Sequence, residues 1–111
     1  MKKKIIASML AMLSINVYAQ EKFCTGFSES LITKERTSGV LNATIHDSGK
    51  SITIDFGKVS YSTSKLIPEK PNGKTFPSGS TKEGNIIQRL TDNHYRFFQM
   101  AFREKVDLTC R

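Results

Sequence analysis

Residues 41–56 read LNATIHDSGKSITIDF, and this stretch decides most of the expected fold. Apolar and polar residues alternate on both sides of the segment DSGK at 47–50. Successive side chains of a strand point to opposite faces, so each half predicts a strand with one buried face. Asp, Ser and Gly favour a tight turn between them. The stretch therefore predicts a β-hairpin, with its buried face formed by Leu41, Ala43, Ile45, Ile52, Ile54 and Phe56.

Strand-like patterns continue on either side of this hairpin. After Gly57 the apolar positions shift by one, to Val59 and Tyr61, which predicts a bulge or bend that keeps the apolar face inward. Residues 23–33 predict an earlier strand, and residues 106–110 alternate and predict a last one. Residues 68–80 hold all three prolines and two glycines, so they are expected to form a loop.

A long helix is expected after that loop. Ser80-Thr81-Lys82-Glu83 matches a capping box, in which a Ser and a Glu side chain satisfy backbone donors at a helix start. At 100° per residue the following side chains separate into an apolar and a polar stripe. A strand over 94–102 competes, because Asp92-Asn93 would suit a turn, but the regular polar stripe favours one helix. The apolar stripe is Ile86, Ile87, Leu90, Phe97, Phe98 and Ala101, and the polar stripe is Gln88, Arg89, Asp92, Arg96, Gln99 and Arg103.

The first nineteen residues predict a secretory signal peptide. Three lysines precede an apolar run at 5–13, and Val17-Tyr18-Ala19 suits a signal peptidase. The run is shorter than the roughly 20 residues that span a bilayer, so no membrane span is expected after cleavage. The mature domain would be residues 20–111, in the bacterial periplasm or secreted. Cleavage lowers the net charge from +7 to +4, which argues against nucleic acid as a partner.

Cys24 and Cys110 are the only cysteines and lie near the two ends of the mature chain. In an exported protein such a pair predicts a disulfide. Closing so long a loop would stabilise the fold by roughly 4–5 kcal/mol in the chain-entropy model. Together these features predict a single small α+β domain, an antiparallel sheet or partial OB-like barrel with one long helix, clasped by the disulfide.

The sequence offers no enzyme signature. His46 and His94 are far apart, the acidic residues are scattered singly, and both cysteines are assigned to the disulfide. None of the common nucleophile, phosphate-binding or metalloprotease motifs occurs. We therefore expect a non-enzymatic protein with no cofactor and no metal. A small hydrolase is the weakest hypothesis because it would lack a site.

Two groups of residues are candidates for binding a partner. The proline-rich loop places Asn72, Lys74, Phe76 and Ser78 together on a shaped segment, and loops on a rigid scaffold often carry recognition. A plain connector to the helix is the alternative. Arg89, Arg96 and Arg103 would share one helix face, which is either a solvated face or a contact with another subunit.

Short matches to a known family run over most of the mature chain. They are Cys24 followed by Phe27 and Ile32-Thr33, then Gly49-Lys50, Gly79-Ser80, the run IQRLTD at 87–92, and Cys110. In these the chain resembles the receptor-binding B subunits of cholera-type and Shiga-type toxins, above all the cholera and heat-labile enterotoxin branch. The chain has no Trp and stops at Arg111, whereas that family has a further strand and a sugar-stacking Trp. The ganglioside site is therefore not carried over.

Two functions follow as hypotheses. The resemblance implies an oligosaccharide-binding barrel, a ring of five subunits with helices around its centre, and an enzymatic partner subunit. The alternative is a periplasmic inhibitor or immunity protein that binds and blocks an enzyme or toxin. In that case Lys74 and Phe76 would anchor the contact, because a buried aromatic with polar neighbours often dominates binding. The expected partner is thus a cell-surface glycan or another protein.

Overall fold

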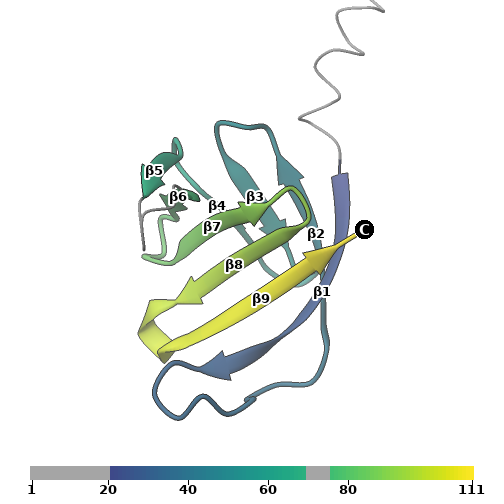
Figure 1. The fold of residues 1–111 in the computed structure, drawn as a ribbon, viewed down its shortest axis with the longest axis vertical. Coiled ribbons are helices and arrows are strands. Elements are labelled where there is room, and N and C mark those ends of the chain that lie inside the picture. The colour runs from purple at the N-terminus through teal and green to yellow at the C-terminus, as the bar shows by residue number, and fades with distance from the viewer. Residues whose placement is uncertain (1–20, 70–75) are drawn as a thin grey trace, which may run out of the picture.

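The computed structural model describes residues 21–69 and 76–111, and these form one antiparallel sheet of nine strands (Figure 1). The sheet order is β4-β3-β2-β1-β9-β8-β7-β6-β5, so the first and last strands of the chain lie side by side. The strands are β1 (Glu21–Ser30), β2 (Leu41–Asp47), β3 (Ile52–Asp55), β4 (Ser60–Ser62), β5 (Ile67–Glu69), β6 (Phe76–Ser80), β7 (Ile86–Thr91), β8 (His94–Gln99) and β9 (Glu104–Cys110).

The sheet curls until β4 approaches β6. Thr63 and Thr81 form an isolated antiparallel bridge, and the Ser64 amide donates to the Ser80 carbonyl at 3.1 Å. A Cβ on Gly79 would lie 2.9 Å from the Thr63 side chain, so a glycine is required at this close approach. The result is an eight-stranded, nearly closed barrel, with β5 as a short ninth strand on β6. Eight strands enclose an interior that side chains just fill.

The predicted hairpin is confirmed. Ile45 pairs with Ile54 in the register of β2 and β3, and both are fully buried. Gly49 has a φ of +87° in the turn, where its amide donates to the Asp47 carboxylate at 2.8 Å. After Gly57, the shift of the apolar positions comes from a turn that leads into β4 rather than from a bulge. Gly57 has a φ of +96° there.

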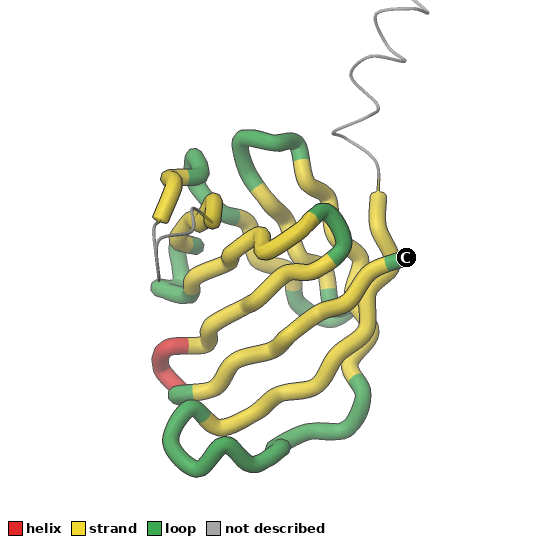
Figure 2. The backbone as a smooth tube through the Cα atoms, in the orientation of Figure 1, coloured by secondary structure: helices red, strands yellow, loops and turns green. Residues whose placement is uncertain are grey.

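The predicted α+β fold is wrong, because the described residues contain no α-helix. The only helical element among them is a 3-10 turn at Met100–Phe102, drawn red in Figure 2. Residues 86–91, in the first half of the expected helix, form β7, and Asp92-Asn93 makes the turn into β8. Ile87 pairs with Phe97 on the inner face and both are fully buried. This pairing places both side chains in the barrel core.

Three features misled the helix prediction. Ile86 and Phe98 pair as half-buried residues on the outer face, so apolar side chains occupy both faces of this hairpin. Arg89 instead points inward, where the pattern expects an apolar residue. The Ser-Thr-Lys-Glu sequence caps a turn, because the Thr81 hydroxyl accepts the Asn85 amide at 3.2 Å. Together these features give the sequence the apolar and polar stripes that an amphipathic helix would have.

The predicted proline-rich loop at 68–80 is partly strand. Pro68 pairs with Pro77 between β5 and β6, at the outer end of the sheet where strands tolerate proline. Residues 70–75 between them lie outside the described residues, and so does the predicted signal peptide. No described helix has the length and apolar character needed to cross a membrane.

The predicted disulfide is confirmed. Cys24 of β1 and Cys110 of β9 are directly opposite in the ladder, and their sulfurs are bonded. The bond closes the two ends of the described domain, and it is consistent with an oxidising compartment. Both cysteines belong to the core, whose largest fully buried members are Tyr95, Phe97, Ile45, Ile52, Ile54, Ile87, Leu108 and Val106.

Candidate functional site

The predicted binding loop is only partly within the described residues. Asn72 and Lys74 lie outside them. Phe76 is half-buried and Ser78 is buried, and both belong to β6, where Ser78 pairs with Gln88 of β7. Ser78 is therefore part of the sheet rather than of an exposed recognition loop. Phe76 keeps part of its side chain accessible to solvent, whereas Ser78 does not.

The three arginines of the predicted helix face do not share a face, so that prediction is wrong. Arg89 lies inside one end of the barrel, where its guanidinium binds Asp47. Arg96 lies on the outer face of β8, where it donates to Asp107 at 2.7 Å. Arg103 ends the 3-10 turn in a left-handed conformation, with a φ of 52°. A β-ladder separates residues that a helix would align.

A buried polar cluster fills the barrel end near Asp47. Arg89 donates two hydrogen bonds to the Asp47 carboxylate, at 2.6 and 2.8 Å, and the Tyr95 hydroxyl donates a third at 2.7 Å. The Lys22 ammonium donates to the Tyr95 oxygen at 2.9 Å. Asp47 is 6% exposed and Tyr95 is fully buried. This cluster is an ion pair with its hydrogen-bonding groups satisfied, as burial requires.

The electrostatics of this cluster favour a structural role. Burial alone would raise the pKa of Asp47, but hydrogen bonds from Arg89, Tyr95 and Gly49 outweigh it and lower the pKa below its ordinary value. Burial and the neighbouring carboxylate raise the pKa of Tyr95, so the phenol stays protonated. An acid held this firmly ionised is a poor proton donor near neutral pH. The cluster therefore closes this end of the barrel as a structural ion pair.

The two histidines take separate positions on the outer surface. His46 lies 2.9 Å from the exposed carboxylate of Glu21, and His94 lies 3.9 Å from Asp107. Asp107 also pairs with Arg96 and Lys105. Burial would raise the pKa of Asp107, but these cations lower it. No group of three or more His, Cys, Asp or Glu side chains suited to a metal occurs within residues 21–69 and 76–111.

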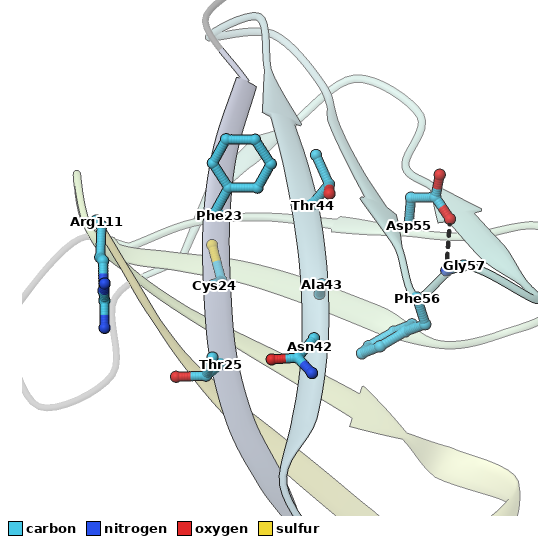
Figure 3. A pocket seen from close by; sticks show the side chains of 10 residues that line it. All are labelled: Phe23, Cys24, Thr25, Asn42, Ala43, Thr44, Asp55, Phe56, Gly57 and Arg111. Atoms are coloured by element: carbon cyan, nitrogen blue, oxygen red, sulfur yellow. Dashed lines mark hydrogen bonds between the residues drawn. The ribbon is translucent and has the colours of Figure 1, made fainter.

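One hollow, which we call the Phe23 hollow, lies on the barrel across β1, β2 and the end of β3 (Figure 3). Its volume is about 440 Å³. The Phe23 ring is 66% exposed and lies beside Thr44 of the neighbouring strand. Asp55 forms the far side, with its carboxylate held by the Gly57 amide at 2.8 Å. The other lining residues are Cys24, Thr25, Asn42, Ala43, Phe56 and Arg111.

A second hollow, which we call the seam, lies where the barrel fails to close. Its volume is about 550 Å³, and its walls come from the β4 segment and from the β6–β7 connection. The two walls come together where Thr63 bridges Thr81 and where the Ser64 amide donates to the Ser80 carbonyl. Six of its eight lining residues carry hydroxyl groups, and the other two are charged: Ser60, Ser62, Thr63, Ser64, Ser80, Thr81, Lys82 and Glu83.

The β6–β7 connection beside the seam is a tightly bonded turn. The Thr81 amide donates to the Asn85 carbonyl at 2.8 Å, and the Gly84 amide donates to the Thr81 carbonyl at 3.0 Å. Thr81 and Asn85 are buried at its base, whereas Lys82 and Glu83 at its tip are exposed. Gly84 has a φ of +87°, which favours glycine. The turn therefore presents one acidic and one basic side chain from a fixed backbone.

The sequence alone did not reveal either hollow. The seam joins two segments about twenty residues apart, and no local pattern signals that they meet. The exposed position of Phe23 follows from the alternation of β1 once Cys24 is placed inside. Comparison with known proteins adds no assignment: no family model, no curated protein and no solved structure matches this chain.

Proposed function

We propose that this chain is an exported, non-enzymatic protein that binds and blocks a partner protein with the turn at residues 81–85. The observation that carries the proposal is the turn itself: a charged tip on a hydrogen-bonded base, standing beside an open, hydroxyl-lined seam. This is the inhibitor or immunity type of function. The proposed recognition surface is therefore the turn at residues 81–85, and not the adjacent proline-rich loop that the sequence suggested.

Preorganisation supports this proposal. Binding costs free energy for each loop and side chain that becomes ordered, so a turn already fixed by its own hydrogen bonds binds at lower cost. Inhibitors of enzymes commonly present such a segment with little backbone change. The base of the turn is anchored twice, by the bridge from Thr81 to Thr63 and by the Thr81–Asn85 hydrogen bonds. The disulfide-closed barrel supplies the rigid support.

The test starts from the mature, oxidised protein immobilised and exposed to an extract of the cell envelope of the source organism. Each captured protein is purified, and its own activity is measured with and without the chain. We expect inhibition that weakens at least tenfold for Lys82→Ala/Glu83→Ala. The Phe23→Ala variant is the matched control, and it should inhibit like the unchanged protein. Full inhibition by the double variant contradicts the proposal.

Glycan binding is the second candidate, and the Phe23 hollow favours it. An exposed aromatic ring offers its electron-rich face to the polarised C–H groups of a sugar. The hydroxyl groups of Thr25 and Thr44, the amide of Asn42 and the carboxylate of Asp55 surround it and suit sugar hydroxyls. This matches the ligand class implied by the resemblance to toxin B subunits. The expected helix-lined ring no longer supports it, since its helix is absent from the described residues.

A glycan array and native mass measurements separate this candidate from the first. If the hollow binds sugars, Phe23→Ala should lose the array signal while Lys82→Ala/Glu83→Ala keeps it. A five-subunit ring would strengthen weak sugar contacts, because later contacts become intramolecular. A strictly monomeric protein with no array signal would contradict the glycan candidate and leave the first untouched.

A further inference from the structure

We propose that one end of the barrel docks on the surface of an anionic lipid bilayer. This end, which we call the loop end, consists of the β1–β2 connection (residues 31–40), the β3–β4 connection (56–59) and the β8–β9 connection (100–103). The occupant is a lipid surface, so this activity goes beyond the blocking of a partner protein and does not depend on the turn at residues 81–85.

The three connections surround one apolar hollow. Figure 2 shows the red 3-10 turn of the β8–β9 connection beside the green β1–β2 connection, and the Leu31 amide donates to the Arg103 carbonyl at 2.9 Å. The hollow has a volume of about 270 Å³, and it is lined by Leu41 after the first connection, Val59 of the second and Gln99 before the third. The other lining residues are Ser28, Phe56, Tyr61, Phe97 and Val106.

Exposed apolar side chains are concentrated at the loop end. Eight large apolar residues are exposed among the described residues, and five of them belong to the three connections. Ile32 is 65% exposed and Phe102 is 72% exposed. The other three are Val40, Val59 and Met100. Such a group marks an interaction surface, either for a membrane or for a protein.

The charges at the loop end favour an anionic membrane. Its connections hold four basic side chains and one acidic side chain, whereas the rest of the described residues hold eight basic and nine acidic ones. The four basic residues are all exposed, and they are Lys34, Arg36, Lys58 and Arg103. Anionic headgroups attract such side chains, while neighbouring apolar side chains enter the boundary between headgroups and acyl chains.

Two of these basic residues occupy backbone positions that favour glycine. Lys34 has a φ of +66° and Arg103 a φ of +52°, and they are the two non-glycine residues with positive φ in the described part of the chain. A left-handed conformation is unfavourable for a residue with a side chain, and glycine would avoid this cost. Both of the joined connections therefore keep a cation where the backbone alone favours glycine. Strained positions of this kind gather at functional contacts.

A bilayer fits this end better than a protein surface does. Each connection places a basic residue within two positions of an exposed apolar one. These pairs are Ile32 with Lys34, Val59 with Lys58, and Phe102 with Arg103. A protein interface needs a closely packed apolar core of complementary shape, whereas a fluid lipid surface admits apolar side chains from separate loops one by one. A second copy of the chain would bring the same excess of positive charge to the contact.

The chain contains no Trp, so Phe102→Trp places a single fluorescent reporter at the loop end. The experiment mixes this variant of the mature, oxidised protein with vesicles of equal parts phosphatidylglycerol and phosphatidylcholine. We expect the Trp emission to shift to shorter wavelength and to be quenched by brominated acyl chains. Phe23→Trp, on the outer face of β1, should show neither change. Vesicles of phosphatidylcholine alone should bind at least tenfold more weakly, because they carry no net charge.

A first pair of variants tests the charges. Lys34→Gly/Arg103→Gly removes two cations and suits the left-handed backbone, so the variant should stay folded. We expect it to sediment with anionic vesicles at least tenfold more weakly. Lys50→Ala/Lys65→Ala is the matched control, since it removes two exposed cations near the β2–β3 turn, where the Leu66 amide donates to the Lys50 carbonyl. Screening makes these distant charges less important, so the control should bind nearly as before.

A second pair of variants tests the apolar side chains. Ile32→Ser/Phe102→Ser should also weaken vesicle binding at least tenfold, because it removes the groups that enter the bilayer. Phe23→Ser/Ile67→Ser is matched in exposure, since both of its side chains are 66% exposed and lie outside the loop end. This control should bind vesicles like the unchanged protein. Circular dichroism of all four variants verifies that they are folded.

Three outcomes would overturn membrane docking. The first is a Phe102→Trp emission that anionic vesicles leave unchanged, and the second is vesicle binding that survives Lys34→Gly/Arg103→Gly. The third is an emission shift without vesicles, which would assign the loop end to a second copy if it follows the concentration of the chain, or to a protein if lipid-free envelope proteins cause it. Inhibition of a captured partner in the absence of vesicles should be equal for Ile32→Ser/Phe102→Ser and the unchanged protein, so each proposal can fail without the other.

Discussion

The two ends of the barrel are closed by different kinds of interaction. At one end Asp47, Arg89, Tyr95 and Lys22 form a hydrogen-bonded ionic cluster. The disulfide belongs to this end, since Cys24 lies two residues from Lys22 on β1. A charge there is tolerated only because its partners are fixed around it.

The opposite end is closed by aromatic rings. Tyr61 and Phe97 have ring centroids 4.8 Å apart, and Phe56 lies 5.9 Å from Phe97 and 6.2 Å from Tyr61. A hollow of about 270 Å³ opens beside them. The contrast shows that a small barrel gains order at one end from directional bonds and at the other from apolar burial. The two ends should respond differently to substitution and to pH.

Removing the disulfide should have the largest effect. Cys24→Ala/Cys110→Ala should lower the free energy of unfolding by roughly 4–5 kcal/mol, because the loop it closes is long. Urea unfolding followed by circular dichroism measures the loss. Hydrogen exchange should accelerate first at the end of β1 near Lys22. A loss below about 1 kcal/mol would show that the sheet alone closes this end.

Removing an aromatic ring should weaken the opposite end almost as much. Phe97 is fully buried against Phe56 and Tyr61, so Phe97→Ala should cost about 4 kcal/mol through lost burial and a cavity. Phe102→Ala is the matched control, because Phe102 is 72% exposed and its loss should change stability by less than about 0.5 kcal/mol. Equal losses in thermal unfolding would contradict the assigned core.

Breaking the ion pair should have the third largest effect. Arg89→Met leaves the buried carboxylate of Asp47 uncompensated, which should cost about 3 kcal/mol. Arg96→Met removes the same type of side chain from the more exposed pair with Asp107, and should cost less than about 1 kcal/mol. Denaturant unfolding of both variants measures this ratio. Similar losses would mean that solvent reaches the Asp47 cluster.

The sequence predicted the regions where alternation and chemistry agree. The hairpin at 41–56 keeps every inward position apolar up to Asp47, and two cysteines allow one pairing. The β7–β8 hairpin was missed because one of its inward-facing positions holds a charged residue instead of an apolar one. Arg89 occupies an inward position, and only its partner Asp47, forty-two residues earlier, makes that possible. No local pattern encodes a partner at that distance.

The candidate site was less predictable for the same reason. Ser60, Ser62 and Lys82 are ordinary surface residues in the sequence, and they gain significance only because the barrel closes incompletely between them. Asp47 was interpreted as a turn former, which is correct for its bond to Gly49 but omits Arg89 and Tyr95. Long-range register, rather than composition, creates both features.

The smallest expected effect is a pH dependence confined to the ionic end. Because the pKa of Asp47 is lowered by folding, its ionised form stabilises the native state above its ordinary value of 3.8. That stabilisation should be lost as the pH falls through the folded pKa. The stability gap between the unchanged protein and Asp47→Asn should therefore be largest near pH 7 and shrink toward pH 3.

Urea unfolding at pH 7, 5 and 3 measures this gap, and two controls locate its cause. Phe97→Ala should lose the same amount of stability at each pH, because this substitution removes no ionisable group. Asp107→Asn should show a weaker pH dependence, since Asp107 is partly exposed and solvent screens its ion pairs. If the stability difference between the unchanged protein and Asp47→Asn stays constant down to pH 3, the Asp47 side chain stabilises the fold through its packing and not through its charge. The two ends of the barrel would then differ in packing alone.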